Sequence, residues 1–499
     1  MSGYWLGVDI GTGGSRALLV DEAGRIVAGR TEAHADMRME RPLWAEQDPD
    51  DWWRAAQVAI RGALDDAGIA GSAVRGVSLS GQMHGLVILD ATGTVIRPSL
   101  IWCDQRSQSQ VDAINAKAGR EQVLAAIANP VLTGFTLPKL LWVRDHEPAS
   151  YERVRHLLLP KDYIRYRLTG EFASEVSDAS GTALFDVVNR RWALDFADTL
   201  GIDRSILPTV YESEEITGTI SPHAALVTGL TAGTPVIGGG GDQAASAVGN
   251  GIVAPGLVSD TIGTSGVVFA HMDEVAYDPQ GRVHTFCHAV RGKWHVMGVT
   301  QGAGLSLQWF RTQLAADANY DSLTAQASES PAGARGLFWL PYLMGERTPH
   351  LDSQCRAAWV GLTAAHTRGD MARALLEGVC FSQKDCLDII TGLGCGVETV
   401  RLSGGGAKSA FWKQLFADVF GKPVSILETQ EGSAYGAALL AMVGTGVFSS
   451  VVEACGVAVR EVETIAPGAN SAYYPRAHAV YSGLYPALRE SFHAISGLA

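Results

Sequence analysis

A single acidic residue, Asp242, stands directly after four glycines in the stretch GGGGDQAASAVG, residues 238–249. The preceding TPVIG is typical of a strand, and the alanine-rich run that follows predicts a buried helix. Glycines keep bulk away from a neighbouring side chain and let another molecule approach the backbone closely. We therefore expect the Asp242 carboxylate to lie exposed at the mouth of a cleft, where it could accept a proton from a bound hydroxyl group.

A glycine loop near the N-terminus could bind phosphate. The loop DIGTGGSR, residues 9–16, lies between two apolar runs that predict a hairpin over residues 4–30. Small residues, hydroxyl groups and one arginine allow such a loop to wrap phosphate oxygens with backbone amides. It is not a Rossmann loop, because ALLV continues as a strand, and it lacks the lysine of a P-loop. Taken alone, the loop also fits a plain turn.

A second loop repeats the first. Residues 260–268, DTIGTSGVV, share its Ile-Gly-Thr core and again lie between two strand-like runs. Two related hairpins predict two similarly built domains, each presenting a glycine loop to a cleft between them. The segment IVAPG, residues 252–256, is the predicted junction because Pro and Gly follow the buried helix there. The predicted domains are residues 1–251 and 252–499.

Polar residues interrupt two further strand-like runs. SGQMHG begins at Ser80, and IWCDQR begins at Ile101. Open α/β sheets bind ligands at strand ends, so His84 and Asp104 are candidates for hydrogen bonding to the hydroxyl groups of a ligand. A lone histidine after a strand also fits a structural role, because most histidines neither bind nor catalyse.

A triple-glycine turn occurs at residues 403–409, SGGGAKS, between a predicted strand and a predicted helix. It is not a P-loop, because Ala407 stands where the glycine before the lysine is required. A flat glycine turn at a helix start lets a planar base lie on the backbone, which favours adenosine over triphosphate. A purely structural strand-to-helix turn is the alternative.

Length and composition set the frame for these motifs. A chain of 499 residues exceeds the size of one core, so we expect two domains. The net charge of −13 disfavours nucleic-acid and anionic-membrane partners, and no apolar run approaches the length of a membrane helix. Seven cysteines without a CxxC pair argue against a disulfide framework or a zinc site and favour a cytoplasmic location.

Taken together, the motifs resemble the FGGY family of carbohydrate kinases from residue 4 to about residue 445. GFTLPKLLWVRDH, residues 134–146, is similar to the first family signature, and AAWVGLTAAHTRGDMARALLE to the second. The resemblance implies an α/β fold of two actin-like, ribonuclease H-like domains with a catalytic cleft between them. It also implies that MgATP phosphorylates a sugar hydroxyl.

The resemblance assigns roles to individual residues. Asp242 is expected to be the general base, and Asp9 is expected to hold magnesium through water. The expected nucleotide-binding residues are Thr12, Gly13, Arg16, Gly263, Thr264, Gly405 and Ser409. The expected sugar-binding residues are Met83, His84, Asp104, Asp242 and Gln243.

The preferred sugar depends on one departure from the family pattern. SGQMHG and the segment from Trp102 to Arg106 are similar to the branch that phosphorylates D-xylulose to D-xylulose 5-phosphate. Gln243 stands where that branch commonly has Asn, so L-ribulose, erythritol-type polyols and glycerol remain alternatives. A non-catalytic sugar-binding protein is a further alternative, against which Asp9, Asp242 and both threonine loops argue. The sequence leaves a homodimer open.

Overall fold

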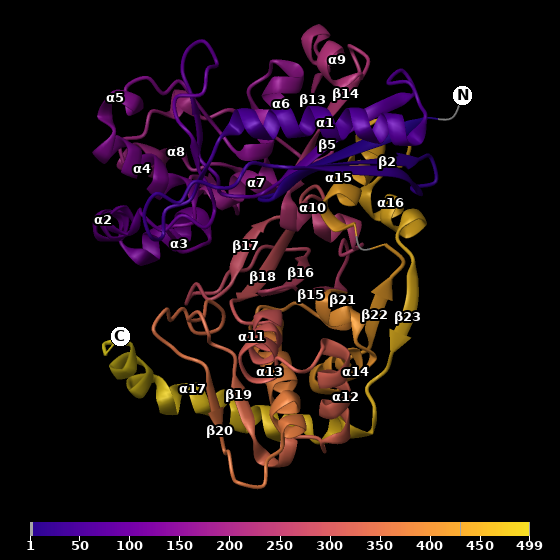
Figure 1. Cartoon of the computed structure of the whole chain (residues 1–499). Coiled ribbons are helices and arrows are strands. Elements are labelled where there is room, and N and C mark those ends of the chain that lie inside the picture. The colour runs from indigo at the N-terminus through magenta and orange to yellow at the C-terminus, as the bar shows by residue number, and fades with distance from the viewer. Residues whose placement is uncertain (1–2, 430, 499) are drawn as a thin grey trace.

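The protein, described by a computed structural model over residues 3–429 and 431–498, consists of two α/β units (Figure 1). The N-terminal half of the chain, indigo to magenta, forms most of the first unit, and the orange segments belong to the second. Each unit is built around one mixed β-sheet.

The first sheet has six strands. In spatial order they are β13 (Ile216–Thr219), β14 (Pro235–Gly241), β5 (Val74–Gly81), β1 (Tyr4–Ile10), β2 (Gly14–Asp21) and β3 (Ile26–Ala33). The neighbours β1, β2 and β3 are antiparallel, whereas β1, β5 and β14 run parallel. Helices α1 (Pro49–Ala67) and α15 (Gly432–Gly444) pack against this sheet, which explains why its central strands are apolar along their length.

The second sheet has seven strands. In spatial order they are β17 (His284–Cys287), β18 (Trp294–Thr300), β16 (Gly266–Met272), β15 (Gly256–Ile262), β21 (Val397–Gly404), β22 (Val424–Leu427) and β23 (Glu461–Ile465). Except for the additional β17, antiparallel and parallel neighbours follow the same order as in the first sheet. The predicted duplication, with one glycine hairpin at β1–β2 and the other at β15–β16, is confirmed.

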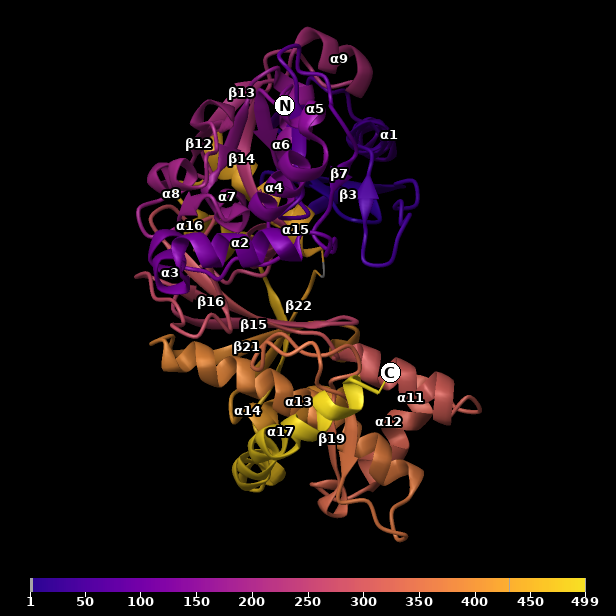
Figure 2. The same ribbon diagram turned by 90° about the vertical axis from the view of Figure 1, so that its left-hand side faces the viewer.

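Helices surround the two sheets. Those outside the first sheet are α2 (Gln108–Ala118), α3 (Arg120–Ile127), α4 (Thr136–His146), α5 (Pro148–Tyr151), α6 (Pro160–Thr169), α7 (Val176–Ala179), α8 (Leu194–Thr199), α9 (Pro222–Thr228) and α10 (Asp242–Gly249). The second half adds α11 (Gly304–Leu314), α12 (Tyr320–Glu329), α13 (Arg368–Gly392), α14 (Ala410–Phe420), α16 (Val451–Ala458) and α17 (Tyr474–Ser496). Figure 2 shows β15 and β21 between α13 and the first unit. Within the described residues, no helix has the length and apolar character that crossing a membrane requires.

Capping residues, proline and glycine mark the ends of two helices in the first unit. Asp48 accepts a hydrogen bond from the Asp50 amide at the start of α1, and Gly68 ends the helix with φ 64°. Helix α6 begins at Pro160 and ends before Gly170, as expected from the two residue types. Both helices therefore begin and end where the local residue types favour it.

The two halves of the chain do not separate cleanly in space. Helices α15 and α16 belong to the second half of the sequence, yet α15 packs on β1, β5 and β14 of the first unit (Figure 1). Small residues permit this contact, because a Cβ added to Gly7 of β1 would lie 2.0 Å from the carbonyl oxygen of Ala434 in α15. The predicted boundary between residues 251 and 252 divides the chain in sequence. In space, however, residues 432–458 of the second predicted domain belong to the first unit.

One buried carboxyl group, Asp260 in β15, is not among the residues to which the sequence assigns a role in the reaction. Its side chain is fully buried, and neither carboxyl oxygen has a hydrogen-bond partner within the described residues. Burial raises the pKa of Asp260 well above its usual value. Because the folded state then holds a proton that the unfolded state has lost, the free energy of unfolding falls as pH rises above about 4.

We predict that Asp260→Asn stabilises the protein at pH 7. The variant removes the charge that burial disfavours, so its free energy of unfolding should exceed that of the wild type by more than about 1 kcal/mol. The gain should shrink towards pH 4, where Asp260 is protonated in the folded state and about half protonated in the unfolded state. Urea unfolding at both pH values measures this difference. The exposed Asp65→Asn is the control and should change stability by less than about 0.5 kcal/mol; a gain independent of pH would contradict the prediction.

Candidate active site

Three motifs meet at one edge of the first sheet. The strand register aligns Ile10 of β1 with Gly81 of β5, and Gly81 with Gly241 of β14. The first hairpin tip, SGQMHG and Asp242 therefore follow strands that end side by side. Parallel strands commonly present ligand-binding residues at this edge.

The first hairpin tip is fixed by hydrogen bonds to two other motifs. Trp102 Nε1 donates to Thr12 Oγ1 at 3.0 Å, and Gln47 Nε2 donates to the Thr12 carbonyl at 2.7 Å. The Gln82 amide donates to the carbonyl of Ile10 at 2.8 Å. Gly13 remains exposed at the tip. This arrangement leaves the backbone of the tip available to a phosphate, the role predicted for it.

The second hairpin tip lies beside the triple-glycine loop. Gly263 and Thr264 are exposed, and their carbonyls accept hydrogen bonds from the first amides of α11 at 2.8 and 3.1 Å. The register pairs Ile262 with Gly404, so the glycine loop begins where the hairpin turns. Gly405 is exposed, whereas Ser409 accepts the Trp412 amide and caps α14. The adenosine contacts of these two residues stay predictions.

Asp242 is the first residue of α10 and is half-buried. Loss of hydration and the negative charge of Asp9 raise the pKa of Asp242 to about 7, although hydrogen bonds from Gln243 act in the opposite direction. A carboxylate with a pKa near neutrality is well matched to the role of a general base.

Asp9 and Asp242 form a pair of carboxylates that suits a cation. Burial raises the pKa of Asp9, and its Oδ1 is buried without a hydrogen-bond partner in the described part of the chain. Mg²⁺ prefers oxygen ligands and retains several waters, so an orphaned carboxylate oxygen beside a second carboxylate fits the predicted contact through water. The role of Asp9 in metal binding stays a prediction.

The histidine of SGQMHG has a defined orientation. His84 has φ 70°, and its carbonyl accepts hydrogen bonds from Lys139 Nζ and Thr136 Oγ1 at 3.0 and 3.1 Å. Its Nδ1 lies 2.7 Å from the Gly181 carbonyl, which can only accept, so Nδ1 carries the proton. Burial lowers the pKa of His84 to about 3. The neutral ring therefore offers Nε2 as an acceptor for a hydroxyl group.

The position of Met83 explains why residue 241, directly before Asp242, is a glycine. A Cβ on Gly241 would lie 2.9 Å from Met83 Cγ, so a larger residue would displace the methionine. Gly239 has φ 76°, and a Cβ there would lie 1.9 Å from the carbonyl oxygen of Leu79. Thus the glycines allow β14 to approach both β5 and Met83, and Met83 lies beside the residue that precedes Asp242.

The geometry does not support the expected sugar contact of Asp104. This side chain is fully buried, and its carboxylate accepts hydrogen bonds from Arg106 Nη2 at 2.7 Å and the Ala45 amide at 2.6 Å. Arg106 in turn lies over the Trp44 ring, 3.8 Å from its centroid. Asp104 therefore holds its own loop together, which the spacing of the motif did not reveal.

Arg16 is already paired with another side chain. Its guanidinium makes a bidentate ion pair with Glu431 at 2.5 and 2.6 Å, and Nη1 donates to Thr31. Arg16 lies opposite Asp9 in the β1–β2 register. A phosphate contact would require Arg16 to exchange Glu431 for the ligand, so its predicted nucleotide role stays a prediction.

The second unit supplies side chains that sequence motifs did not identify. The His84 ring stacks on Phe135 at 4.7 Å between centroids, and Phe286 of β17 lies 6.1 Å from His84. His284, also in β17, stacks on Phe286 at 5.7 Å. Burial, followed by the charge of Arg347, lowers the pKa of His284 to about 3. An apolar strand containing two such rings has no short signature, so only the fold brings it to His84.

The fold and this site define a two-domain sugar kinase of the actin-like class. Residues 4–249 match the N-terminal domain of the FGGY family of carbohydrate kinases, and residues 259–445 match its C-terminal domain. The chain belongs to this family and is a carbohydrate kinase. The two family segments lie on either side of the predicted junction.

Named relatives cover nearly the whole chain. A xylulose kinase of Bacillus subtilis is 39% identical over 96% of this chain and 94% of its own length. A xylulose kinase of Escherichia coli is 39% identical over 90% of this chain and 92% of its own. The crystal structure of xylulose kinase from Rhodospirillum rubrum, 32% identical, superposes with a TM-score of 0.93 over 98% of this chain and 100% of that chain.

We predict that kcat/KM for the sugar rises with pH and levels off above about pH 7. Only ionised Asp242 can accept a proton, and its pKa in the ligand-free protein is about 7, so kcat/KM should fall roughly tenfold per unit at lower pH. Initial rates at subsaturating MgATP and sugar, from pH 5.5 to 8.5, measure this profile. A rate that stays constant down to pH 5.5 would contradict the raised pKa of Asp242.

Proposed function

We propose that this protein transfers the γ-phosphoryl group of ATP to a ketopentose, with D-xylulose as the preferred substrate and D-xylulose 5-phosphate as the product. The observation that carries the proposal is the position of Asp242, directly after Gly241, which contacts Met83, and at the same sheet edge as the first glycine hairpin. The xylulose kinases named above support the choice of sugar, because they match both domains and nearly the full length.

The proposed reaction is an in-line transfer. A sugar hydroxyl gives its proton to the Asp242 carboxylate while its oxygen bonds to the γ-phosphorus. The bond between that phosphorus and the β,γ-bridging oxygen breaks, and ADP leaves. Such transfers demand mainly positioning and charge stabilisation from the protein. His84 Nε2 accepts a hydrogen bond from another hydroxyl and orients the sugar.

The remaining residues hold the phosphates and the metal. The amides around Thr12 and Thr264 would surround phosphate oxygens from opposite units, and Gly405 would receive adenosine. Asp9 would hold Mg²⁺ through water, and the metal, when bound, would neutralise charge on the phosphates. Closure of the two units would exclude water, which competes with the sugar for ATP.

Gln243 bears on the choice among sugars. It is half-buried, follows the base directly and forms a hydrogen bond with Asp242. We expect its amide to contact the bound sugar as well as the base. L-ribulose, erythritol-type polyols and glycerol are the substrates against which D-xylulose must be compared.

We predict that ADP release with MgATP is fastest on D-xylulose. In a coupled assay over ketopentoses, tetritols and glycerol, Asp242→Asn should lose at least about a hundredfold in kcat on the best substrate, because a general base contributes 10²- to 10⁴-fold.

The variant provides its own folding control. Because the pKa of Asp242 is raised in the folded state, ionisation of Asp242 destabilises the protein above about pH 4. Asp242→Asn should therefore melt above the wild-type temperature at pH 8 while being inactive. Absence of turnover on every sugar would contradict the proposed function, whereas glycerol as the best substrate would contradict only the choice of ketopentose.

A further inference from the structure

A buried polar cluster holds the strand that carries Asp242. The Gly241 amide donates to Ser177 Oγ at 3.1 Å, and the Gly239 amide donates to the Ser213 carbonyl at 2.8 Å. Gly241 directly precedes Asp242, and α10 has no side-chain cap at its first residue. The position of the base thus depends on what holds Gly241.

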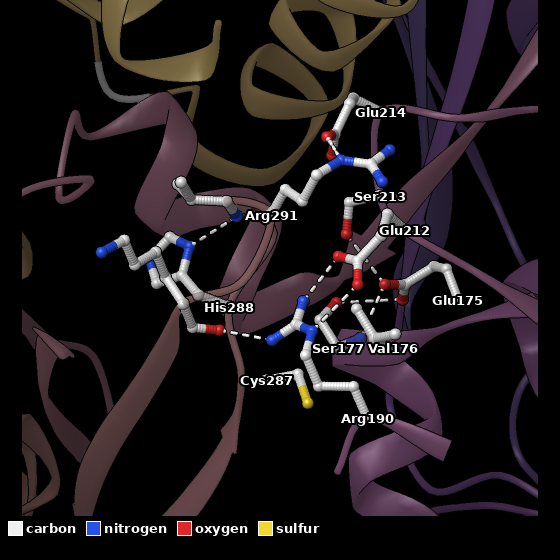
Figure 3. Close-up of polar contacts among 12 residues, drawn as sticks. Glu175, Val176, Ser177, Arg190, Glu212, Ser213, Glu214, Cys287, His288 and Arg291 are labelled. Atoms are coloured by element: carbon white, nitrogen blue, oxygen red, sulfur yellow. Dashed lines mark hydrogen bonds and ion pairs between the residues drawn. The ribbon is translucent and has the colours of Figure 1, made fainter. Parts of the chain in front are cut away.

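Glu175 organises this cluster (Figure 3). Its carboxylate accepts hydrogen bonds from Ser177 Oγ at 2.9 Å, the Ser177 amide at 2.7 Å and Ser213 Oγ at 2.9 Å. Because the Ser177 hydroxyl donates its only proton to Glu175, its lone pairs are available to the Gly241 amide. The bond from Ser177 Oγ to Glu175 and the bond from the Gly241 amide to Ser177 Oγ therefore form a chain from Glu175 to Gly241.

Two buried cations, Lys161 and Arg165, pair with the carboxylates of the cluster. Lys161 Nζ lies 3.3 Å from Glu175 and 2.8 Å from Asp162, and all three side chains are fully buried. Unpaired charges in this environment would be costly, whereas a paired and hydrogen-bonded group keeps a defined orientation. The cluster is consequently a stiff support for β14.

The same cluster is connected to the second unit. Next to Ser213, Glu212 forms a bidentate pair with Arg190, which also donates to the Lys293 carbonyl at 2.6 Å. The Cys287 amide donates to Ser180 Oγ at 3.0 Å. Figure 3 shows Cys287 and Arg190 beside the Glu175 cluster. The residues around the Glu175 cluster therefore also contact the end of β17 and the segment that follows it.

We propose that Ser177 and Glu175 are positioning residues for the general base. They touch neither substrate, but they hold the amide before Asp242 and so fix the direction of its carboxylate. This inference rests on the proposed phosphoryl transfer. It assigns a role to residues 175–177, which no chemical motif in the sequence indicates.

Ser177→Ala tests the proposal directly. Without the hydroxyl, the Gly241 amide loses its acceptor and the base is less well placed. We expect kcat to fall between about fivefold and a hundredfold, because small misplacements of reacting groups carry such costs. The KM values for ATP and D-xylulose should stay within about twofold, since Ser177 contacts neither binding site. Steady-state kinetics with the full-length protein give both parameters.

Two further variants separate positioning from folding. Ser177→Thr keeps the Oγ acceptor and should recover most of the lost kcat. Ser78→Ala is the matched control, because Ser78 is fully buried on neighbouring β5 and its hydroxyl has no partner within the described residues. This control should retain wild-type kcat. If Ser177→Ala fails to fold, Glu175→Gln, which keeps the shape but weakens the acceptor, provides the same measurement.

The outcomes distinguish this inference from the proposed function. Absence of wild-type turnover on any sugar would contradict the proposed function and, with it, this inference. An active wild type with Ser177→Ala, or with Glu175→Gln where that replaces it, within twofold in kcat would overturn only the positioning role. An equal loss in Ser78→Ala, or a loss confined to KM, would also overturn it.

Discussion

The repulsion between Asp9 and Asp242 is the constraint on which the site depends. Loss of hydration raises the pKa of both carboxyl groups, and the negative charge of Asp9 raises the pKa of Asp242 further. The protein maintains this pair with rigid structure. Asp9 lies within the central strand β1, and Asp242 begins a helix whose preceding strand is held by Ser177 and Ser213. The stability of the surrounding sheet therefore offsets the cost of holding these two carboxyl groups close together. Such a pair suits a metal ion and a proton.

The repeated sheet explains how a phosphate site can lie across two units. Each sheet places a glycine hairpin between its first two strands, so the two tips come from equivalent positions. The chain then returns, and α15 packs on the first sheet beside α10. Glu431, just before α15, pairs with Arg16 of the first hairpin. The connection between the units therefore lies next to the first glycine hairpin.

The surroundings of His84 illustrate how neighbouring groups set the chemistry of a side chain. His84 becomes a neutral acceptor because Gly181 fixes its proton on Nδ1 and because burial lowers its pKa. Phe135 and the rings of β17 enclose it from both units. Asp104 shows the converse, since a carboxylate that appeared suited to a hydroxyl group is fully engaged by Arg106 and Ala45.

The sequence by itself determined the two glycine hairpins, the helix ends at Gly68 and Gly170, and Asp242 as the candidate base. These features depend on local physics, because turns, caps and strand runs are encoded over a few residues. Only the tertiary structure decided that α15 joins the first unit, that Arg106 and the Ala45 amide bind the Asp104 carboxylate, and that Ser177 accepts the amide before Asp242. Those outcomes depend on contacts between residues tens to hundreds of positions apart, such as Ser177 with Gly241 and Arg16 with Glu431. A local pattern cannot specify such contacts, because packing of the whole chain decides which polar groups find partners.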